Sequence, residues 1–158
     1  MAEAFFYHLT RSSLDQTLPM LLAKALQAGW RVLVRGSDPE RLARLDARLW
    51  LGAEDEFLPH GLAGGAHDAD QPVLLSGGAD LPEGRACLMA IDGAPVSAAD
   101  CAATARVCVI FDGGDEDALA RARELWRGLT GAGVAASYWS EEGGRWQLKT
   151  RHGGEKPG

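Results

Sequence analysis

The sequence predicts a single α/β domain, in which a mostly parallel sheet carries helices on both faces. Apolar, strand-like segments alternate along the chain with segments whose leucines recur at helical spacing, and this alternation is typical of parallel strands joined by helical crossovers. The segment Val107–Phe111 is apolar throughout, as expected for a strand that is covered on both faces. A length of 158 residues fits one domain with its own hydrophobic core.

The N-terminal part of the chain predicts a strand, a helix and a second strand. Ala4–Leu9 is rich in aromatic residues and Arg31–Arg35 alternates, so both are expected to be strands. The segment between them predicts a helix that ends at Gly29, because apolar residues recur there at helical spacing. Those residues are Leu14, Leu18, Leu21, Leu22, Ala25 and Leu26.

The middle of the chain predicts a second helix and further short elements. Asp38-Pro39 is a typical helix start, since an aspartate cap is followed by proline at the first helical position. The segment Glu54–Gly65 is expected to be irregular, because it contains turn residues and no periodicity. Two short apolar strands and a short helix or loop are expected after it, at Pro72–Leu75, Ala86–Ile91 and Pro95–Ala103.

The C-terminal part predicts a long helix and an antiparallel hairpin. Carboxylates between Asp112 and Asp117 offer caps for a helix that runs to about Thr130. Ala135–Ser140 and Arg145–Lys149 alternate and are joined by a turn with two glycines, so they predict a hairpin at the edge of a mixed sheet. We therefore expect one domain over residues 1–149 and a disordered tail over residues 150–158.

The charge and composition of the chain argue against several classes of protein. The 16 Lys and Arg residues and 22 Asp and Glu residues give a net charge of −6, so a broad basic face for direct nucleic-acid binding is not expected. No targeting signal is apparent and no apolar stretch approaches the roughly 18 residues of a membrane span, so we expect a cytoplasmic protein. Cys87, Cys101 and Cys108 are odd in number and lack CxxC spacing, which argues against a disulfide framework.

A search for catalytic motifs favours a noncatalytic domain without cofactor or metal. The motifs GxxxxGK[ST], GxGxxG and GxSxG are absent, so the expected architecture is Rossmann-like without a nucleotide site. The four histidines show no zinc-ligand spacing.

One enzymatic alternative stays open. Asp92 and Asp112 follow apolar strands, at the position where α/β enzymes carry catalytic carboxylates. A small α/β hydrolase or nucleotide-binding enzyme would need a pocket at that place with converging polar groups. Helix capping alone also explains Asp112.

A basic and aromatic flank on the predicted helix Asp117–Thr130 points to a peptide ligand. Helical spacing turns an apolar arc toward the sheet and leaves Trp126 at its edge, with Arg123 and Arg127 just beyond. A guanidinium group matches a carboxylate through two hydrogen bonds, so an acidic peptide with an apolar C-terminal residue would fit. The alternative is an ordinary amphipathic helix whose arginines meet Glu124 or solvent.

Five segments of the chain resemble the chi subunit family of bacterial DNA polymerase III, in the family's order. They are FFYHL, GWRVLVR, RLDARLW, EDEFLPHGLAG and ALARARELWRGLTGAG. The resemblance implies a noncatalytic α/β accessory subunit of the replicative polymerase. It also implies a linker that joins the clamp loader, usually through the psi subunit, to the acidic C-terminal tail of the single-stranded-DNA-binding protein, with contact to nucleic acid mainly indirect.

The same resemblance implies roles for individual residues. The family's tail-binding arginine falls on Arg123, its neighbouring aromatic residue on Trp126 and the next basic residue on Arg127. A further basic position falls on Thr130, which is uncharged, so we expect either a weaker site or a shift of charge to Arg121.

Phe57 is the second position for which the resemblance implies a role. It follows three acidic residues on a loop flanked by glycines. The residues alone leave two interpretations open, because such a side chain can anchor its loop in the core or form a hot spot for a partner protein. The resemblance implies the second, with psi or an accessory helicase as the partner.

Overall fold

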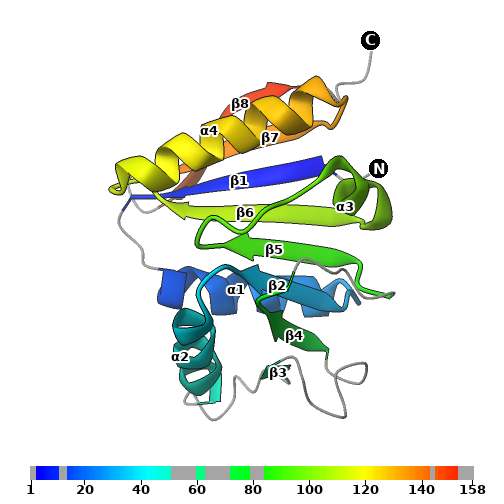
Figure 1. The fold of residues 1–158 in the computed structure, drawn as a ribbon, viewed down its shortest axis with the longest axis vertical. Coiled ribbons are helices and arrows are strands. Elements are labelled where there is room, and N and C mark those ends of the chain that lie inside the picture. The colour runs from blue at the N-terminus through cyan, green and yellow to red at the C-terminus, as the bar shows by residue number, and fades with distance from the viewer. Residues whose placement is uncertain are drawn as a thin grey trace.

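Strands and helices alternate along the chain in the computed structural model, which describes residues 3–10, 14–50, 60–62, 72–78, 84–142 and 145–152. In chain order the elements are β1 (Glu3–Leu9), α1 (Leu14–Gln27), β2 (Val32–Gly36), α2 (Pro39–Trp50), β3 (His60–Leu62), β4 (Val73–Ser76), β5 (Cys87–Ile91), α3 (Ala98–Ala103), β6 (Arg106–Asp112), α4 (Glu116–Gly131), β7 (Ala136–Glu142) and β8 (Arg145–His152). Figure 1 shows how they are arranged.

Within the described residues the strands form one 8-stranded sheet in the order β3-β4-β2-β5-β6-β1-β7-β8. Every neighbouring pair is parallel except β7 and β8, which form an antiparallel hairpin at one edge. The N-terminal strand β1 therefore lies inside the sheet, between β6 and β7. This topology confirms the predicted mixed, mostly parallel sheet with a C-terminal edge hairpin.

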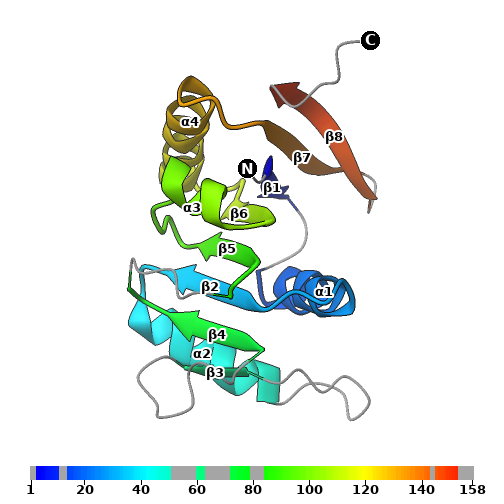
Figure 2. The ribbon, with the colours of Figure 1, turned by 90° about the vertical axis from the view of Figure 1, so that its right-hand side faces the viewer.

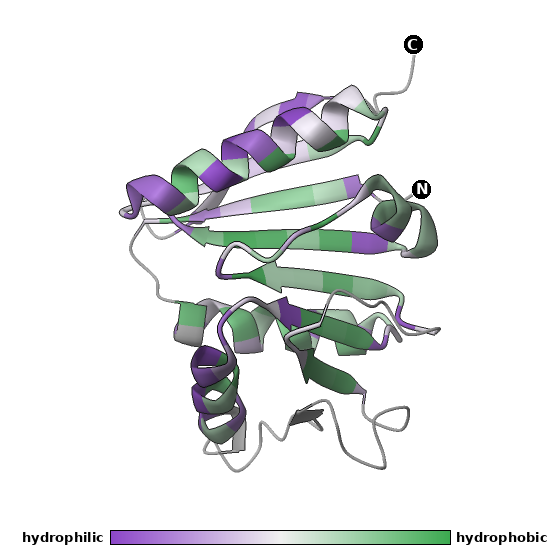
Figure 3. Ribbon diagram, in the orientation of Figure 1, coloured by the Kyte–Doolittle hydropathy of each residue, from purple (hydrophilic) through white to green (hydrophobic). Residues whose placement is uncertain are grey.

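Helices cover both faces of the sheet, as predicted. Figure 2 shows α1 on one side and α3 and α4 on the other. Leucines of α1 and α2 belong to one buried apolar cluster, whereas Cys101 of α3 and Ala122 and Leu129 of α4 belong to a second. Apolar residues dominate the central strands, and polar residues alternate with apolar ones along α2 and α4 (Figure 3). The central strands of the sheet are thus buried between two apolar layers.

Capping side chains explain where α2 and α3 begin. The Asp38 carboxylate accepts a hydrogen bond from the Glu40 amide at 3.0 Å, and α2 begins at Pro39, as the sequence predicts. Ser97 caps α3 in a capping box with Asp100, so the segment predicted to be a short helix or loop contains a helix.

A buried ion pair that the sequence analysis did not predict joins the sheet to α3. Arg35 of β2 is only 2% exposed, and its Nη1 lies 2.9 Å from Oδ2 of Asp100. Burial favours a higher pKa for Asp100, but hydrogen bonds from Arg35 and Ser97 outweigh it and lower the pKa below the usual 3.8. The carboxylate is therefore held in its charged form.

The predicted boundary of the tail is wrong by three residues. β8 runs to His152, because Thr150, Arg151 and His152 pair with Tyr138, Ser137 and Ala136 of β7. A bulge between Tyr138 and Trp139 shifts the register of this hairpin. Residues 153–158 of the predicted tail lie outside the described residues.

Three further predictions concern the segment Glu54–Gly65, the cysteines and membrane spans. The predicted irregular segment Glu54–Gly65 contains the short strand β3, which pairs with β4. The three cysteines are buried free thiols, which confirms the absence of disulfides between them. No helix in the described part of the chain has the length and apolar character of a membrane span.

Candidate functional site

Helix α4 carries the predicted basic and aromatic flank, and capping at both ends fixes its position. The Asp115 carboxylate caps its start by accepting hydrogen bonds from the amides of Asp117 and Ala118. At its end, the amide of Ala132 bonds to carbonyl groups of the last turn, and Gly133 follows with a positive φ of 89°. The predicted inward arc is confirmed, because Ala122 and Leu129 are buried and Leu119, Leu125 and Trp126 pack against the same cluster.

Trp126 lies at the junction between α4 and the sheet. Its ring packs edge-on against Phe6 of β1, with centroids 5.2 Å apart, and against Tyr138 of β7, with centroids 6.2 Å apart. The indole remains half-buried, so one part is fixed by the protein and another part faces solvent. Trp126 thus lies at the edge of the apolar arc of α4, where the helical spacing predicts it.

Arg123 and Arg127 lie on the exposed side of the same helix. Neither makes an ion pair with another described residue, so of the two environments that the alternative allows, Glu124 and solvent, both arginines have solvent. Burial raises the pKa of Tyr138 and lowers the pKa of His8, and the charge of Arg123, which lies near both side chains, opposes the first shift and adds to the second. Arg123 is thus available to an anionic ligand beside an aromatic surface.

Tyr138 and His8 extend this surface, and the sequence analysis did not identify them. The Tyr138 hydroxyl lies 2.7 Å from Nδ1 of His8, and both rings contact Phe111 of β6. The pairing that brings them together is long-range, since β7 lies beside β1 in the sheet. The alternating pattern around Tyr138 predicted a strand, but it did not predict that this strand pairs with β1. We call Arg123, Trp126, Arg127, Tyr138 and His8 the α4 site.

Thr130 and Arg121 do not add charge to the α4 site. The Thr130 hydroxyl donates to the carbonyl of Trp126 at 2.7 Å, one turn back on its own helix. Arg121 lies against the backbone of Gly93, where a Cβ atom on that glycine would be 2.9 Å from its Nη1. The predicted shift of charge to Arg121 is therefore not observed, and the α4 site has two arginines.

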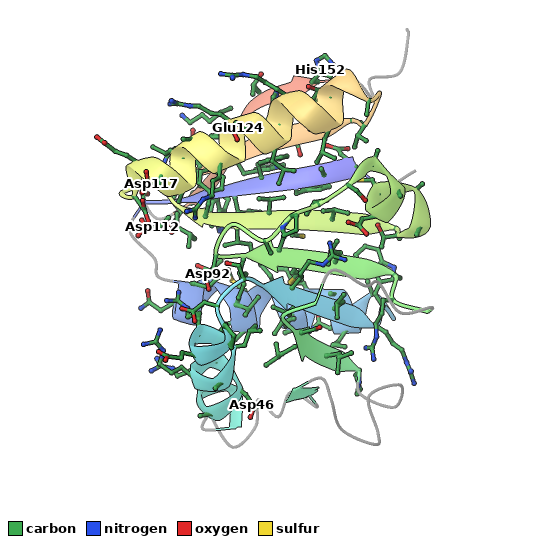
Figure 4. All side chains as sticks on the ribbon, in the orientation of Figure 1. Asp46, Asp92, Asp112, Asp117, Glu124 and His152 are labelled. Atoms are coloured by element: carbon green, nitrogen blue, oxygen red, sulfur yellow. The ribbon has the colours of Figure 1, made fainter. Side chains whose placement is uncertain are left out.

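A separate cavity of about 800 Å³ lies between α4 and the strand ends, and Asp92 and Asp112 both line it. Figure 4 shows the two carboxylates at the edge where β5 and β6 end. Asp112 accepts a hydrogen bond from the Gly114 amide at 2.9 Å, and Asp92 lies 3.9 Å from Arg41 in an ion pair. The pocket required by the enzymatic alternative thus exists, but both of its carboxylates have local structural partners.

Comparison with known protein families decides the family of this chain. The family model of the DNA polymerase III chi subunit, HolC, matches residues 1–137. The chain belongs to the DNA polymerase III chi subunit family. The DNA polymerase III subunit chi of Escherichia coli (strain K12) is 31% identical over 83 residues, which cover 48% of this chain and 56% of that protein. The chain thus matches little more than half the length of this curated relative.

The segment matched by the chi family model includes four of the five residues of the α4 site. It contains all of α4 and β1, and therefore Arg123, Trp126, Arg127 and His8, but it ends one residue before Tyr138. Membership in this family supports an accessory role in DNA replication. Phe57, the second predicted site residue, lies inside the matched segment but outside the described residues.

Proposed function

We propose that this chi-family chain is a noncatalytic adaptor that captures the acidic C-terminal tail of the single-stranded-DNA-binding protein at the α4 site. The observation that carries the proposal is the position of Arg123. It has no ion-pair partner among the described residues, and it lies beside the half-buried Trp126 and the Tyr138–His8 pair. A peptide with a C-terminal apolar residue can cover the rings while its carboxylate meets the guanidinium group.

The expected affinity follows from a few terms. A hydrogen bond to a charged group contributes about 1.5–3 kcal/mol, and burial of one aromatic side chain contributes about 1.5–3 kcal/mol. The entropy of association opposes binding by several kcal/mol, so an affinity on the order of micromolar is expected. Because the arginines are exposed, salt screens the ion pairs and binding weakens as ionic strength rises.

A calorimetric titration with a short acidic peptide ending in Asp-Ile-Pro-Phe tests the proposal. Arg123→Glu is expected to abolish binding and to leave the fold intact, because the side chain is exposed. Arg44→Glu is the matched control, since it makes the same charge change on an exposed position of α2. Unchanged affinity in the Arg123→Glu protein would remove Arg123 from the site.

The second half of the proposed adaptor function concerns Phe57. We propose that this residue docks psi or an accessory helicase and so connects the chain to the clamp loader in the cytoplasm. Phe57→Ala is expected to bind the tail peptide with unchanged affinity and to lose the second partner in a pull-down with purified psi. If the variant retains both partners, Phe57 is not part of the interface.

A noncatalytic role also fits the cavity at the strand ends. Three of its acidic residues have structural partners, since Asp112 bonds to the Gly114 amide, Asp115 caps α4 and Asp92 pairs with Arg41. We therefore favour the adaptor over the hydrolase or nucleotide-binding alternative. Stoichiometric binding of ATP or GTP that is lost in Asp92→Asn and Asp112→Asn proteins would reverse this preference.

A further inference from the structure

A groove of about 430 Å³ lies between α1 and the β7–β8 hairpin, on the face of the sheet opposite α4. Figure 2 shows α1 and this hairpin on the same side of the sheet. Side chains alternate between faces along β1, so Phe6 packs toward α4 whereas its neighbours line the groove. We call it the aromatic groove, because five aromatic side chains line it: Phe5, Tyr7, Trp30, Trp139 and Trp146.

The rim of the aromatic groove leaves apolar surface open to solvent. Among the described residues, the large apolar side chains that are most exposed are Met20, at 43%, and Leu148, at 42%. Met20 lines the groove from α1. Leu148 of β8 stands opposite Trp139 in the antiparallel pair and therefore projects from the same face. Two exposed apolar residues on either side of a groove mark a surface that a partner can cover.

The charged side chains that line the aromatic groove are cations, Lys24 and Arg106. The guanidinium carbon of Arg106 lies 4.2 Å from the ring centroid of Phe5 and 5.2 Å from that of Trp30. Neither cation makes an ion pair with another described residue, and the nearby carboxylate of Glu3 pairs with Arg151 at 3.7 Å. On a chain with a net charge of −6, these cations favour a ligand that carries its own carboxylate.

Two of the five rings of the aromatic groove lie beyond the family match, whereas its other lining residues lie within it. The family match ends at residue 137, so Trp139 of β7 and the whole of β8, with Trp146, lie beyond it. The groove therefore depends on a segment that the family assignment does not account for.

Two features favour a peptide over single-stranded nucleic acid as the occupant. A nucleic-acid groove needs a row of cations that follows the phosphate backbone, and the lining of this groove offers two. The face of Phe5 is also covered by Arg106, which leaves less ring surface for stacking of a base. One bulky apolar side chain with an adjacent carboxylate fits the aromatic lining and the charge of the groove better.

We propose that the aromatic groove is a second docking site for an acidic peptide, which inserts a bulky apolar side chain between the rings and places a neighbouring carboxylate on Arg106. The ligand chemistry rests on the proposed function, but the site is separate from the α4 site. A peptide with an aromatic residue next to its terminal carboxylate can therefore engage the chain at two places on opposite faces of the sheet.

Fluorine NMR of the full chain labelled with fluorotryptophan tests both sites in one titration. The probe is the short acidic peptide ending in Asp-Ile-Pro-Phe, and its C-terminal amide is the control. Resonances of Trp30, Trp139 and Trp146 report on the groove, whereas Trp126 reports on the α4 site. Assignment follows from replacing each tryptophan in turn by phenylalanine.

In the unsubstituted protein we expect the resonances of the groove tryptophans and of Trp126 to shift when the peptide is added. In Arg123→Glu we expect only the resonances of the groove tryptophans to shift. The groove midpoint is the peptide concentration at which the resonances of the groove have shifted halfway. Arg106→Gln is expected to raise this midpoint by about tenfold or more, because one charged hydrogen bond is lost. Lys24→Glu is expected to raise the groove midpoint as well. Because Lys24 is exposed, this second variant keeps the fold intact. Arg44→Gln is the control and should leave the groove midpoint unchanged.

The remaining outcomes separate the two proposals. A shift of Trp126 without any shift of the groove tryptophans overturns the second site and leaves the α4 proposal standing. The opposite result supports the groove and overturns the α4 site. If a thymidine oligonucleotide moves the groove resonances and the peptide does not, the groove binds nucleic acid and the peptide proposal is wrong.

Discussion

The hydroxyl group of Tyr138 lies 2.7 Å from Nδ1 of His8, and this contact joins β7 to β1 beside the α4 site. Burial is the main cause that lowers the pKa of His8 below its ordinary 6.5, Asp112 opposes it, and Arg123 lowers it further. His8 is therefore neutral at neutral pH, and in the tautomer that carries its proton on Nε2, Nδ1 accepts the hydrogen bond from Tyr138. Protonation removes this acceptor and places a second positive charge near Arg123.

The first prediction concerns pH and stability. Because the pKa of folded His8 lies below the value of 6.5 in the unfolded chain, the unfolded state binds more protons between the two values. The His8 contribution to the free energy of unfolding is thus fully present above pH 6.5 and is lost as the pH falls through the pKa of the folded state. Urea unfolding across this range should show the decline.

A variant separates His8 from the other titrating groups in the first prediction. His8→Gln keeps a polar side chain but cannot gain the proton, so its stability should fall less steeply below pH 6.5. Asp100 has a lowered pKa and loses its contribution only in more acidic solution, below 3.8. Equal slopes for both proteins just below pH 6.5 would contradict the assignment.

The second prediction concerns the close approach of His8 to the turn after β6. A Cβ atom on Gly113 would lie 1.7 Å from Nε2 of His8 and 2.8 Å from the carbonyl oxygen of Leu9. Gly113→Ala must therefore displace the His8 ring and part of the backbone, and we expect it to lower the free energy of unfolding by about 1–3 kcal/mol.

Its matched control is the next glycine. A Cβ atom on Gly114 would meet Oδ1 of Asp112 at 3.4 Å, which is ordinary contact, so Gly114→Ala should change stability much less. Chemical denaturation of both proteins gives the comparison. Similar losses at the two positions would show that the steric contact with His8 is unimportant.

The third prediction concerns the buried ion pair between Arg35 and Asp100. Asp100→Asn leaves the guanidinium group of Arg35, which is 2% exposed, without its charged partner. Such a loss costs about 3–5 kcal/mol of folding free energy. Asp115→Asn makes the same chemical change at an exposed helix cap, where asparagine caps as well as aspartate, and should cost far less. Guanidinium chloride unfolding measures both, and equal costs would refute a special role for the buried pair.

The comparison of sequence and structure separates local from long-range information. The start of α2 at Pro39 and the inward arc of α4 were predictable, because caps and periodicity act within a few residues. The Tyr138–His8 contact was not, since it depends on β1 lying between β6 and β7. The sequence predicted a strand that ends at Arg35, and only the fold places Asp100 beside this side chain.

The same distinction holds for the site. Arg123 and Trp126 are neighbours on one helix, so spacing alone places them together. The aromatic groove combines side chains from α1, β1, β6, β7 and β8, and no single segment of the sequence indicates it. The bulge between Tyr138 and Trp139 and the pairing of β8 as far as His152 are likewise properties of strand pairing.

The last prediction restores a charge that the α4 site lacks. The resemblance described above implies a basic residue at position 130, whereas this chain has a threonine whose hydroxyl donates to the carbonyl of Trp126. Thr130 follows Arg127 by three residues and Trp126 by four, so a longer cationic side chain at this position can reach the same surface. A partly exposed ion pair adds about 0.2–1 kcal/mol, so Thr130→Arg should bind the acidic tail peptide up to about fivefold more tightly.

Thr130→Gln has a long neutral side chain and serves as the control for this change. The gain from arginine should shrink as salt is added, because screening weakens an exposed ion pair, whereas the glutamine protein should match the unsubstituted chain at every ionic strength. Calorimetric titration at low and high salt measures both effects. A gain that is equal for the two substitutions would show that contact area, and not charge, limits binding at the α4 site.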